Sequence, residues 1–167
     1  MYIPFDQISL ESRIWIYQSD RALTSSEENI ISTKLQAFTD SWQVHAKNME
    51  ASFAILYRHF IVIAANENIN AASGCSIDDS VRVVKSIGTH LSIDFFNRSN
   101  IAFSNPDGVV LIPLDTLKQA HDIGKWNGHS LYFNNLIASV SDLKNAWLTP
   151  AHATWLSRYL PQQTLSS

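Results

Sequence analysis

The longest uninterrupted apolar stretch of the chain is Phe60–Ala65, which is six residues long. A helix that spans a bilayer needs about 18 or more such residues, whereas six is a common strand length. The stretch is apolar throughout rather than alternating, which is typical of a strand buried on both faces. This segment therefore favours a sheet covered on two sides and argues against a membrane-spanning protein.

Two further segments have the composition of strands. Ala51–Tyr57 precedes the apolar stretch, and only Arg58 and His59 separate the two. So short a connection predicts a tight antiparallel hairpin, although the turn lacks the favoured Asn-Gly pair. Arg13–Gln18 is rich in β-branched and aromatic residues and predicts another strand.

Two segments have the periodicity of amphipathic helices. The first follows Thr24-Ser25-Ser26-Glu27, which matches a capping box. Its apolar stripe consists of Ile31, Leu35, Phe38 and Trp42, and His45 continues it. The second helix is expected to have Ser76 as its N-cap and two acids, Asp78 and Asp79, in its first turn. Its apolar stripe consists of Ile77, Val81, Val84, Ile87 and Leu91.

The order of these elements suggests a fold. Asn100–Ser104 predicts a fourth strand, Asn105–Gly108 a turn, and Val109–Ile112 a fifth strand. The resulting β-α-β-β-α-β order, with one extra strand, is that of a ferredoxin-like α+β fold with an antiparallel sheet. Two helices would cover one face, so the C-terminal third or a homodimer partner must cover the other.

The C-terminal third favours the first of these options. We expect short helices at 114–121 and 141–148, and a last helix that Thr149 and Pro150 open and that runs to about residue 160. The segment 131–140 stays ambiguous between strand and irregular structure. The expected organisation is a single domain, 1–167, with a core at about 12–112 and a helical cover at about 113–160.

Composition excludes several classes of function. Hydrophobic residues make up 46% and charged residues 16%, which argues against disorder. The net charge of −3 gives no general attraction to nucleic acid or anionic membranes. A single cysteine rules out an intramolecular disulfide and a Cys-rich zinc site.

The chain also lacks the common phosphate-binding, metal-binding and catalytic motifs. The chain has no P-loop, no G-x-G-x-x-G, no H-E-x-x-H and no G-x-S-x-G, so no cofactor or metal is expected. The six histidines include no pair at close helical spacing. Met1–Asp6 lacks the features of a signal peptide, and a lone free thiol fits a reducing compartment, so we expect a cytoplasmic protein.

The most unusual segment is Ser73-Gly74-Cys75-Ser76, a glycine, a thiol and two hydroxyls before a helix. The N–H groups of a first helical turn can stabilise a thiolate or hold an anion. In the expected topology, His45, Trp42 and Arg13 lie at the same sheet edge as this loop.

Three functions fit these residues. The first is a small-molecule or anion-binding module with a pocket formed by Ser73, Gly74, Cys75, Ser76, Arg13 and Trp42. The second is a thiol-dependent enzyme with Cys75 as nucleophile and His45 as base. The third is a homodimeric interaction protein that uses the apolar sheet face.

Simpler interpretations exist for each residue. A lone cysteine is often a packing residue, and a histidine on an apolar stripe is often a satisfied edge residue. Ser73 and Ser76 also suit a turn and a cap. Trp42 suits a core, and Arg13 suits a paired or solvated strand end.

Two segments resemble one family. Ser12–Arg21 (SRIWIYQSDR) and Ala72–Asp78 (ASGCSID) resemble a family of small uncharacterised bacterial proteins, and the resemblance extends through Trp42 and His45 to the C-terminal tryptophan region. Members are sometimes labelled as ABC-transporter ATPases. The chain lacks the phosphate loop and its lysine, so the label has no physical support here, and the resemblance implies no catalytic residues.

Overall fold

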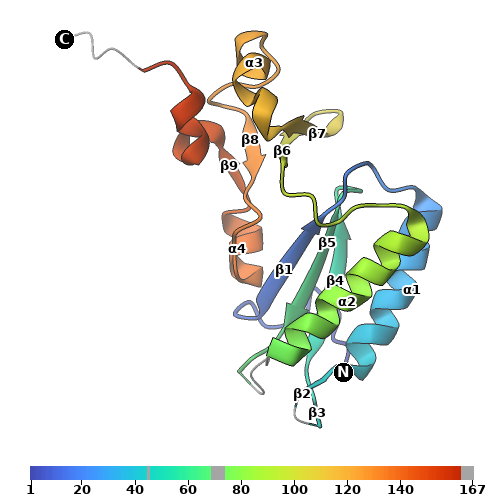
Figure 1. The fold of residues 1–167 in the computed structure, drawn as a ribbon. Helices are drawn as coiled ribbons and strands as arrows, with labels where there is room; N and C mark the ends of the chain where they lie inside the picture. Colours follow the sequence, from blue (N-terminus) through green and yellow to red (C-terminus); the bar gives the residue numbers. More distant parts are fainter. Residues whose placement is uncertain (45, 69–73, 163–167) are drawn as a thin grey trace. The chain divides into compact units, whose positions relative to one another are not determined.

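In the computed structural model, residues 1–44, 46–68 and 74–162 are described, and the chain divides into two compact units (Figure 1). The first unit comprises Met1–Asn97 and Asn135–Asn145. The second comprises Arg98–Asn134 and Ala146–Ser167. Each unit has its own antiparallel sheet and its own apolar core, so the predicted α+β class is confirmed.

The first unit is built on a three-stranded sheet in the order β1-β5-β4. Its helices α1 and α2 lie on the same side of this sheet (Figure 1). Two very short strands, β2 and β3, pair with each other beyond the end of α1. The elements are β1 (Arg13–Gln18), α1 (Ser25–Ser41), β2 (Gln43–Val44), β3 (Lys47–Asn48), β4 (Ala51–Leu56), β5 (Phe60–Ala65), α2 (Gly74–Leu91) and α4 (Val140–Asn145).

The predicted β4–β5 hairpin is confirmed, with Leu56 opposite Phe60. Its turn places Tyr57 and Arg58 at φ values of 54° and 57°, and the N–H of His59 donates to the Leu56 carbonyl at 3.1 Å. Two successive positive φ values are what Asn-Gly normally supplies in such a turn. Tyr57 and Arg58 are held in this unfavourable conformation because Leu23 N–H donates to the Arg58 carbonyl at 2.7 Å.

The capping box at the start of α1 is also confirmed. The Glu27 N–H donates to Thr24 Oγ1 at 3.2 Å, and the Thr24 N–H donates to Glu27 Oε1 at 2.9 Å. Arg21 adds two charge-assisted bonds to the Glu27 carboxylate, at 2.8 and 2.7 Å. These bonds, with the Arg21 guanidinium first, lower the pKa of Glu27 to about 2. The helix ends at Ser41, so the stripe does not extend to His45, which lies outside the described residues.

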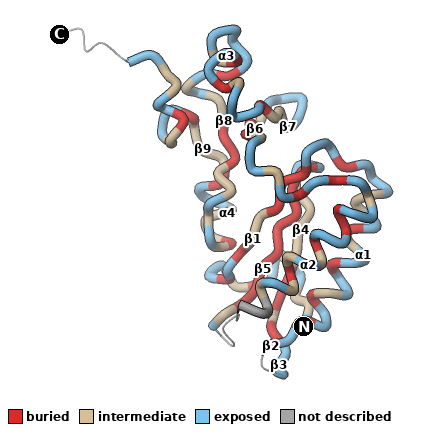
Figure 2. Tube along the Cα trace, in the orientation of Figure 1, coloured by how far each residue is buried: buried red, intermediate tan, exposed pale blue. Residues whose placement is uncertain are grey.

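Both faces of the first sheet are buried, as expected (Figure 2). One face packs against α1 and α2 through residues such as Ile31, Leu35 and Ile87. The other face is covered by two short segments of the same unit, Ile3–Ile8 and Ile137–Leu143. The C-terminal third therefore supplies part of this cover, as expected, through Ile137–Leu143, and the N-terminal segment Ile3–Ile8 supplies the rest.

The ferredoxin-like arrangement is not confirmed. It requires the strand that follows α2 to lie beside β1, but that strand belongs to the second unit. The free side of β1 is instead occupied by the segment before α4, because Ile14 N–H donates to the Ala138 carbonyl at 3.0 Å and Val140 N–H donates to the Ser12 carbonyl at 3.0 Å. Backbone groups at that edge are thereby satisfied without a fourth strand.

The second unit contains a four-stranded sheet in the order β7-β6-β8-β9. The Trp126 ring stacks on Phe103 at 5.4 Å, and its indole N–H donates to the Leu117 carbonyl at 2.8 Å. The elements are β6 (Asn100–Asn105), β7 (Gly108–Pro113), the 3₁₀ helix η1 (Leu114–Thr116), α3 (Leu117–Asp122), β8 (Leu131–Phe133), β9 (Leu148–Pro150), and the 3₁₀ helices η2 (Ala151–Ala153) and η3 (Trp155–Tyr159).

The prediction of a last helix that begins at Thr149 and Pro150 is wrong. Thr149 and Pro150 end the edge strand β9 instead of opening a helix. A proline, which lacks an N–H, is tolerated in a sheet at just such an edge position. Two separate 3₁₀ turns follow, the second capped by Thr154. Within the described residues, no helix has the length and apolarity required to cross a bilayer.

Candidate functional site

The predicted sheet edge lies where β1 begins and β5 ends. Arg13 is paired with Ala65 across the two strands, and its guanidinium lies 5.0 Å from the centre of the Trp15 ring. The Trp15 ring in turn lies 6.1 Å from the Trp42 ring. Arg13 and Trp42, which are distant in sequence, therefore belong to one cluster that Trp15 joins.

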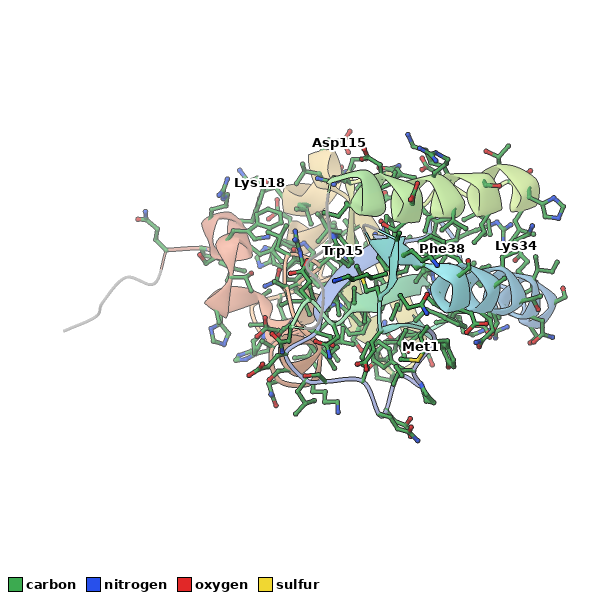
Figure 3. All side chains as sticks on the ribbon, turned by 90° about the horizontal axis from the view of Figure 1, so that it is seen from below. Met1, Trp15, Lys34, Phe38, Asp115 and Lys118 are labelled. Atoms are coloured by element: carbon green, nitrogen blue, oxygen red, sulfur yellow. The ribbon has the colours of Figure 1, made fainter. Side chains whose placement is uncertain are left out.

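Trp42 is the buried member of this cluster, with 3% of its surface exposed. Its ring packs 4.9 Å from the ring of Phe38 on α1. Figure 3 labels Phe38 on α1 and Trp15 on β1. Its indole N–H has no hydrogen-bond partner within the described part of the chain. A buried, unpaired donor is costly, so this N–H is a position at which a ligand acceptor would add stability.

For the other predicted residues, the structure describes no side-chain position at this edge. His45 and Ser73 lie outside the described residues. Gly74, Cys75 and Ser76 form the first residues of α2, so Ser76 is not the N-cap and the two acids fall beyond the first turn. Apolar periodicity fixes the buried face of a helix but not its first residue, which explains this correction. The thiol–imidazole pairing stays a prediction.

Arg13 is paired with an acid, and two further acids bond to asparagines in the segment after β5. Its Nη1 lies 3.5 Å from Glu67 Oε1, and half-buried Glu50 accepts a bond of 3.1 Å from the buried Asn66 amide. Glu11 accepts a further bond of 3.1 Å from Asn68. Glu67 is the carboxylate in contact with the Arg13 guanidinium, and this contact weakens the attraction of the edge for an anion.

A second site, which the sequence did not predict, lies at the C-terminal end of α2. It is an open depression of about 470 Å³, which we call the α2-end depression. Its lining includes two carboxylates, one ammonium, two hydroxyls and one exposed aromatic ring: Asp20, Asp94, Lys85, Thr89, Ser92 and Phe96.

The way α2 ends creates this depression. Ser92 adopts a φ of 55°, and the Ile93 N–H donates back to the Gly88 carbonyl at 2.9 Å. This is a Schellman arrangement, in which a left-handed residue reverses the chain after a helix. The returning chain passes so close to α2 that a Cβ on Gly88 would lie 2.6 Å from the Ile93 oxygen.

Two aspartates brace the returning segment. The Asp94 N–H donates to Asp20 Oδ1 at 3.2 Å, and the Phe96 N–H donates to Asp94 Oδ1 at 2.8 Å. The Asp20 N–H also donates to the Asp94 carbonyl at 3.1 Å. Among the described residues, the second oxygen of each carboxylate accepts no side-chain bond, so both oxygens remain available to a donor.

Lys85 and Phe96 line the same depression. The Lys85 ammonium lies 5.6 Å from the centre of the Phe96 ring and forms no ion pair with the described residues. The Phe96 ring packs edge-on against Tyr17 at 5.6 Å. Burial raises the pKa of Tyr17, an effect that its hydrogen bond to Ser80 partly offsets.

The only sequence signal for this site is the pair Phe95-Phe96 just after a helix. Phe95 is buried in the core, so its neighbour Phe96 must point away from the core, and 36% of its surface is exposed. Asp20 approaches from the end of β1, a contact that no local pattern indicates. In the described ranges, no cluster of three or more His, Cys, Asp or Glu residues has the geometry of a metal site.

Comparisons of the chain with protein-family models, curated proteins and solved structures give no significant match. The family resemblance of the two sequence segments therefore stays a prediction.

Proposed function

We propose that the protein is a binding module for a small organic ligand, which occupies the α2-end depression. The observation that carries this proposal is the exposed Phe96 ring beneath an unpaired Lys85 ammonium. Aromatic rings with few convergent polar groups are typical of small-molecule sites. An unpaired lysine beside two partly used carboxylates offers both a cation and acceptors within one depression.

The chemistry of the lining defines the ligand class. A flat ring would take the place of the ammonium over Phe96, since offset ring stacking is favourable. An anionic group on the ligand would pair with Lys85, whose flexible side chain can follow it. An amino group would donate to the free oxygens of Asp20 and Asp94. The ligand is therefore a flat-ring compound that carries one acid and one amine.

An NMR titration with 4-aminobenzoate, benzoate and aniline tests this proposal. The first compound carries ring, acid and amine, and each of the others lacks one polar group. We expect shift changes at Lys85, Thr89 and Phe96, and binding of 4-aminobenzoate about tenfold tighter than that of either fragment. Unchanged resonances at these residues up to about 10 mM probe would contradict the proposal.

Two variants separate this site from unspecific binding. Lys85→Met should weaken 4-aminobenzoate binding about fivefold while leaving aniline binding unchanged. The matched control is Lys34→Met, an exposed lysine on α1 that Figure 3 shows and that does not line the depression. If both variants weaken 4-aminobenzoate binding equally, Lys85 acts only through the net charge of the protein.

A second candidate is a ligand at the predicted sheet edge. The unpaired, buried Trp42 indole N–H favours it, because a ligand acceptor there would remove an unsatisfied donor. Ser73, Gly74, Cys75, Ser76 and Arg13 would form the rest of this pocket. A phosphate titration of the wild type and of Arg13→Gln tests it, and binding that is equal in the two proteins would exclude Arg13 as a ligand.

The thiol-dependent enzyme is the remaining proposal for this edge. It requires His45 to accept a proton from Cys75 and thereby raise the share of thiolate near neutral pH. The pH dependence of Cys75 alkylation by iodoacetamide measures that share directly. A thiol that titrates near the ordinary value of about 8.5 would exclude an activated nucleophile.

A further inference from the structure

β7 is an edge strand whose protection is confined to one proline, Pro113, at its end. Within the described residues it pairs only with β6, so one side of its backbone has no partner strand. Its six residues, Gly108–Pro113, carry no charge. Natural edge strands are normally guarded by charges, bulges or covering segments, because an unpaired apolar edge recruits another strand.

A groove of about 540 Å³ runs beside this edge. One wall is β7, through Val110–Pro113, and the other is the α3 region, through Thr116 to Lys125. Its exposed surface is mainly apolar, and Ile123 at its rim has 64% of its surface exposed. Side chains on one face of an added strand would enter this groove, since successive side chains of a strand alternate between faces.

The two ends of the groove differ in the charge of their exposed residues. η1 follows β7 directly, so Leu114 and Asp115 lie at the end of β7. Asn105, just before β7, lines the same groove as Ile123 and Lys125, so the far end of α3 lies near the start of β7. One end therefore carries an exposed leucine and an acid, and the other carries an exposed isoleucine and a base.

We propose that β7 pairs antiparallel with β7 of a second copy of this chain. A two-fold axis across the strand brings the end of one β7 to the start of the other. Leu114 of one copy then meets Ile123 of the other, and Asp115 meets Lys125. Both contacts occur twice, so the edge would be complementary to itself in apolar contacts and in charge.

Charge complementarity favours a second copy over an unrelated peptide. Neither Asp115 nor Lys125 has an ion pair among the described residues, and both are exposed. Asp107 also lies near the start of β7, so Asp115 of the second copy would meet one base and one acid there. A partner without an acid at that position would leave Lys125 unpaired.

Sedimentation equilibrium of the full chain tests the proposal. We expect a concentration-dependent mass that rises from 18.8 kDa toward twice that value. Asp115→Lys and Lys125→Asp should each raise the dimer Kd about tenfold, and the double variant should return to within about threefold of the wild type. Circular dichroism of each variant checks that the fold is intact.

Three outcomes would overturn the proposal. One is a chain that stays monomeric up to about 1 mM. Another is a dimer that neither single variant weakens, and the third is a double variant that stays as weak as the single variants. Hydrogen exchange adds a local readout, because amides of Gly108–Ile112 should gain protection as the protein concentration rises.

Discussion

The ideal Cβ position of Gly88 lies 2.6 Å from the carbonyl oxygen of Ile93. This oxygen belongs to the backbone that returns from α2, so a side chain at residue 88 would have to displace a main-chain segment. The same close approach holds Asp94 and Phe96 beside the end of α2, where they line the depression.

Gly88→Ala should destabilise the protein by about 1–3 kcal/mol, because the cost of overpacking exceeds the gain in helix propensity. Urea unfolding measures the change. Thr89→Ala, an exposed neighbour on α2, is the control and should change the free energy of unfolding by less than about 0.5 kcal/mol. Equal stability of Gly88→Ala and wild type would mean that the returning segment is not packed against α2.

Ser92→Gly should change the free energy of unfolding in the opposite direction and stabilise the protein. Ser92 adopts a φ of 55°, which is unfavourable for a residue with a Cβ and free of strain for glycine. We expect a gain in stability of about 0.5–1 kcal/mol, because the relief of strain exceeds the added entropy of the unfolded chain. A rise in the urea midpoint with an unchanged slope would show this, and a fall in the midpoint would contradict it.

Glu27→Gln isolates the charge of the capping box, since glutamine can also serve at this position. The pKa of Glu27 is about 2 in the folded protein and near 4.5 otherwise. The stabilisation by the carboxylate is therefore present above pH 4.5 and is lost as the pH falls from 4.5 toward 2.

We expect wild type to exceed Glu27→Gln by about 1 kcal/mol at pH 7, since solvent screens part of the Arg21–Glu27 pair. The difference should shrink on acidification. Glu28→Gln is the matched control, because Glu28 lies 4.0 Å from Arg58 in a loose, exposed pair. A difference that does not change with pH would exclude the ion pair as its source.

Trp126→Phe tests the core of the second unit. The substitution removes the 2.8 Å bond to the Leu117 carbonyl and leaves a small void beside Phe103. We expect a loss of about 2–3 kcal/mol, measured by hydrogen exchange of β6 amides. Trp155→Phe is the control, because Trp155 is only half-buried and its N–H bond to Tyr132 is longer, at 3.2 Å.

The predicted edge shows how far topology can be inferred from sequence. Strand and helix order alone indicated that Arg13 and Trp42 approach each other, and the structure joins them through Trp15. The unpaired Trp42 N–H and the contact of Arg13 with Glu67 were not predictable, because hydrogen-bond partners depend on loops that local patterns do not define. The pairing of Cys75 with His45 stays a prediction.

The elements that depend on local interactions could be predicted from the amino-acid pattern. β1 and β5 have the predicted bounds, Thr24 and Glu27 form the predicted capping box, and Phe60–Ala65 is buried on both faces. Periodicity and capping act over a few residues, so they can be recognised without knowledge of the rest of the chain.

The contacts between distant segments, by contrast, could be read only from the folded chain. It placed β6 in a separate sheet, put Ala138 beside β1, and covered the second face of the first sheet with Ile3–Ile8 and Ile137–Leu143. A hydrophobic pattern states that a face must be buried but not by which partner, because apolar burial is non-directional and many apolar segments compete for the same face. The lining of the α2-end depression likewise brings together Asp20 and Asp94, which are far apart in sequence and hydrogen-bonded in the folded chain.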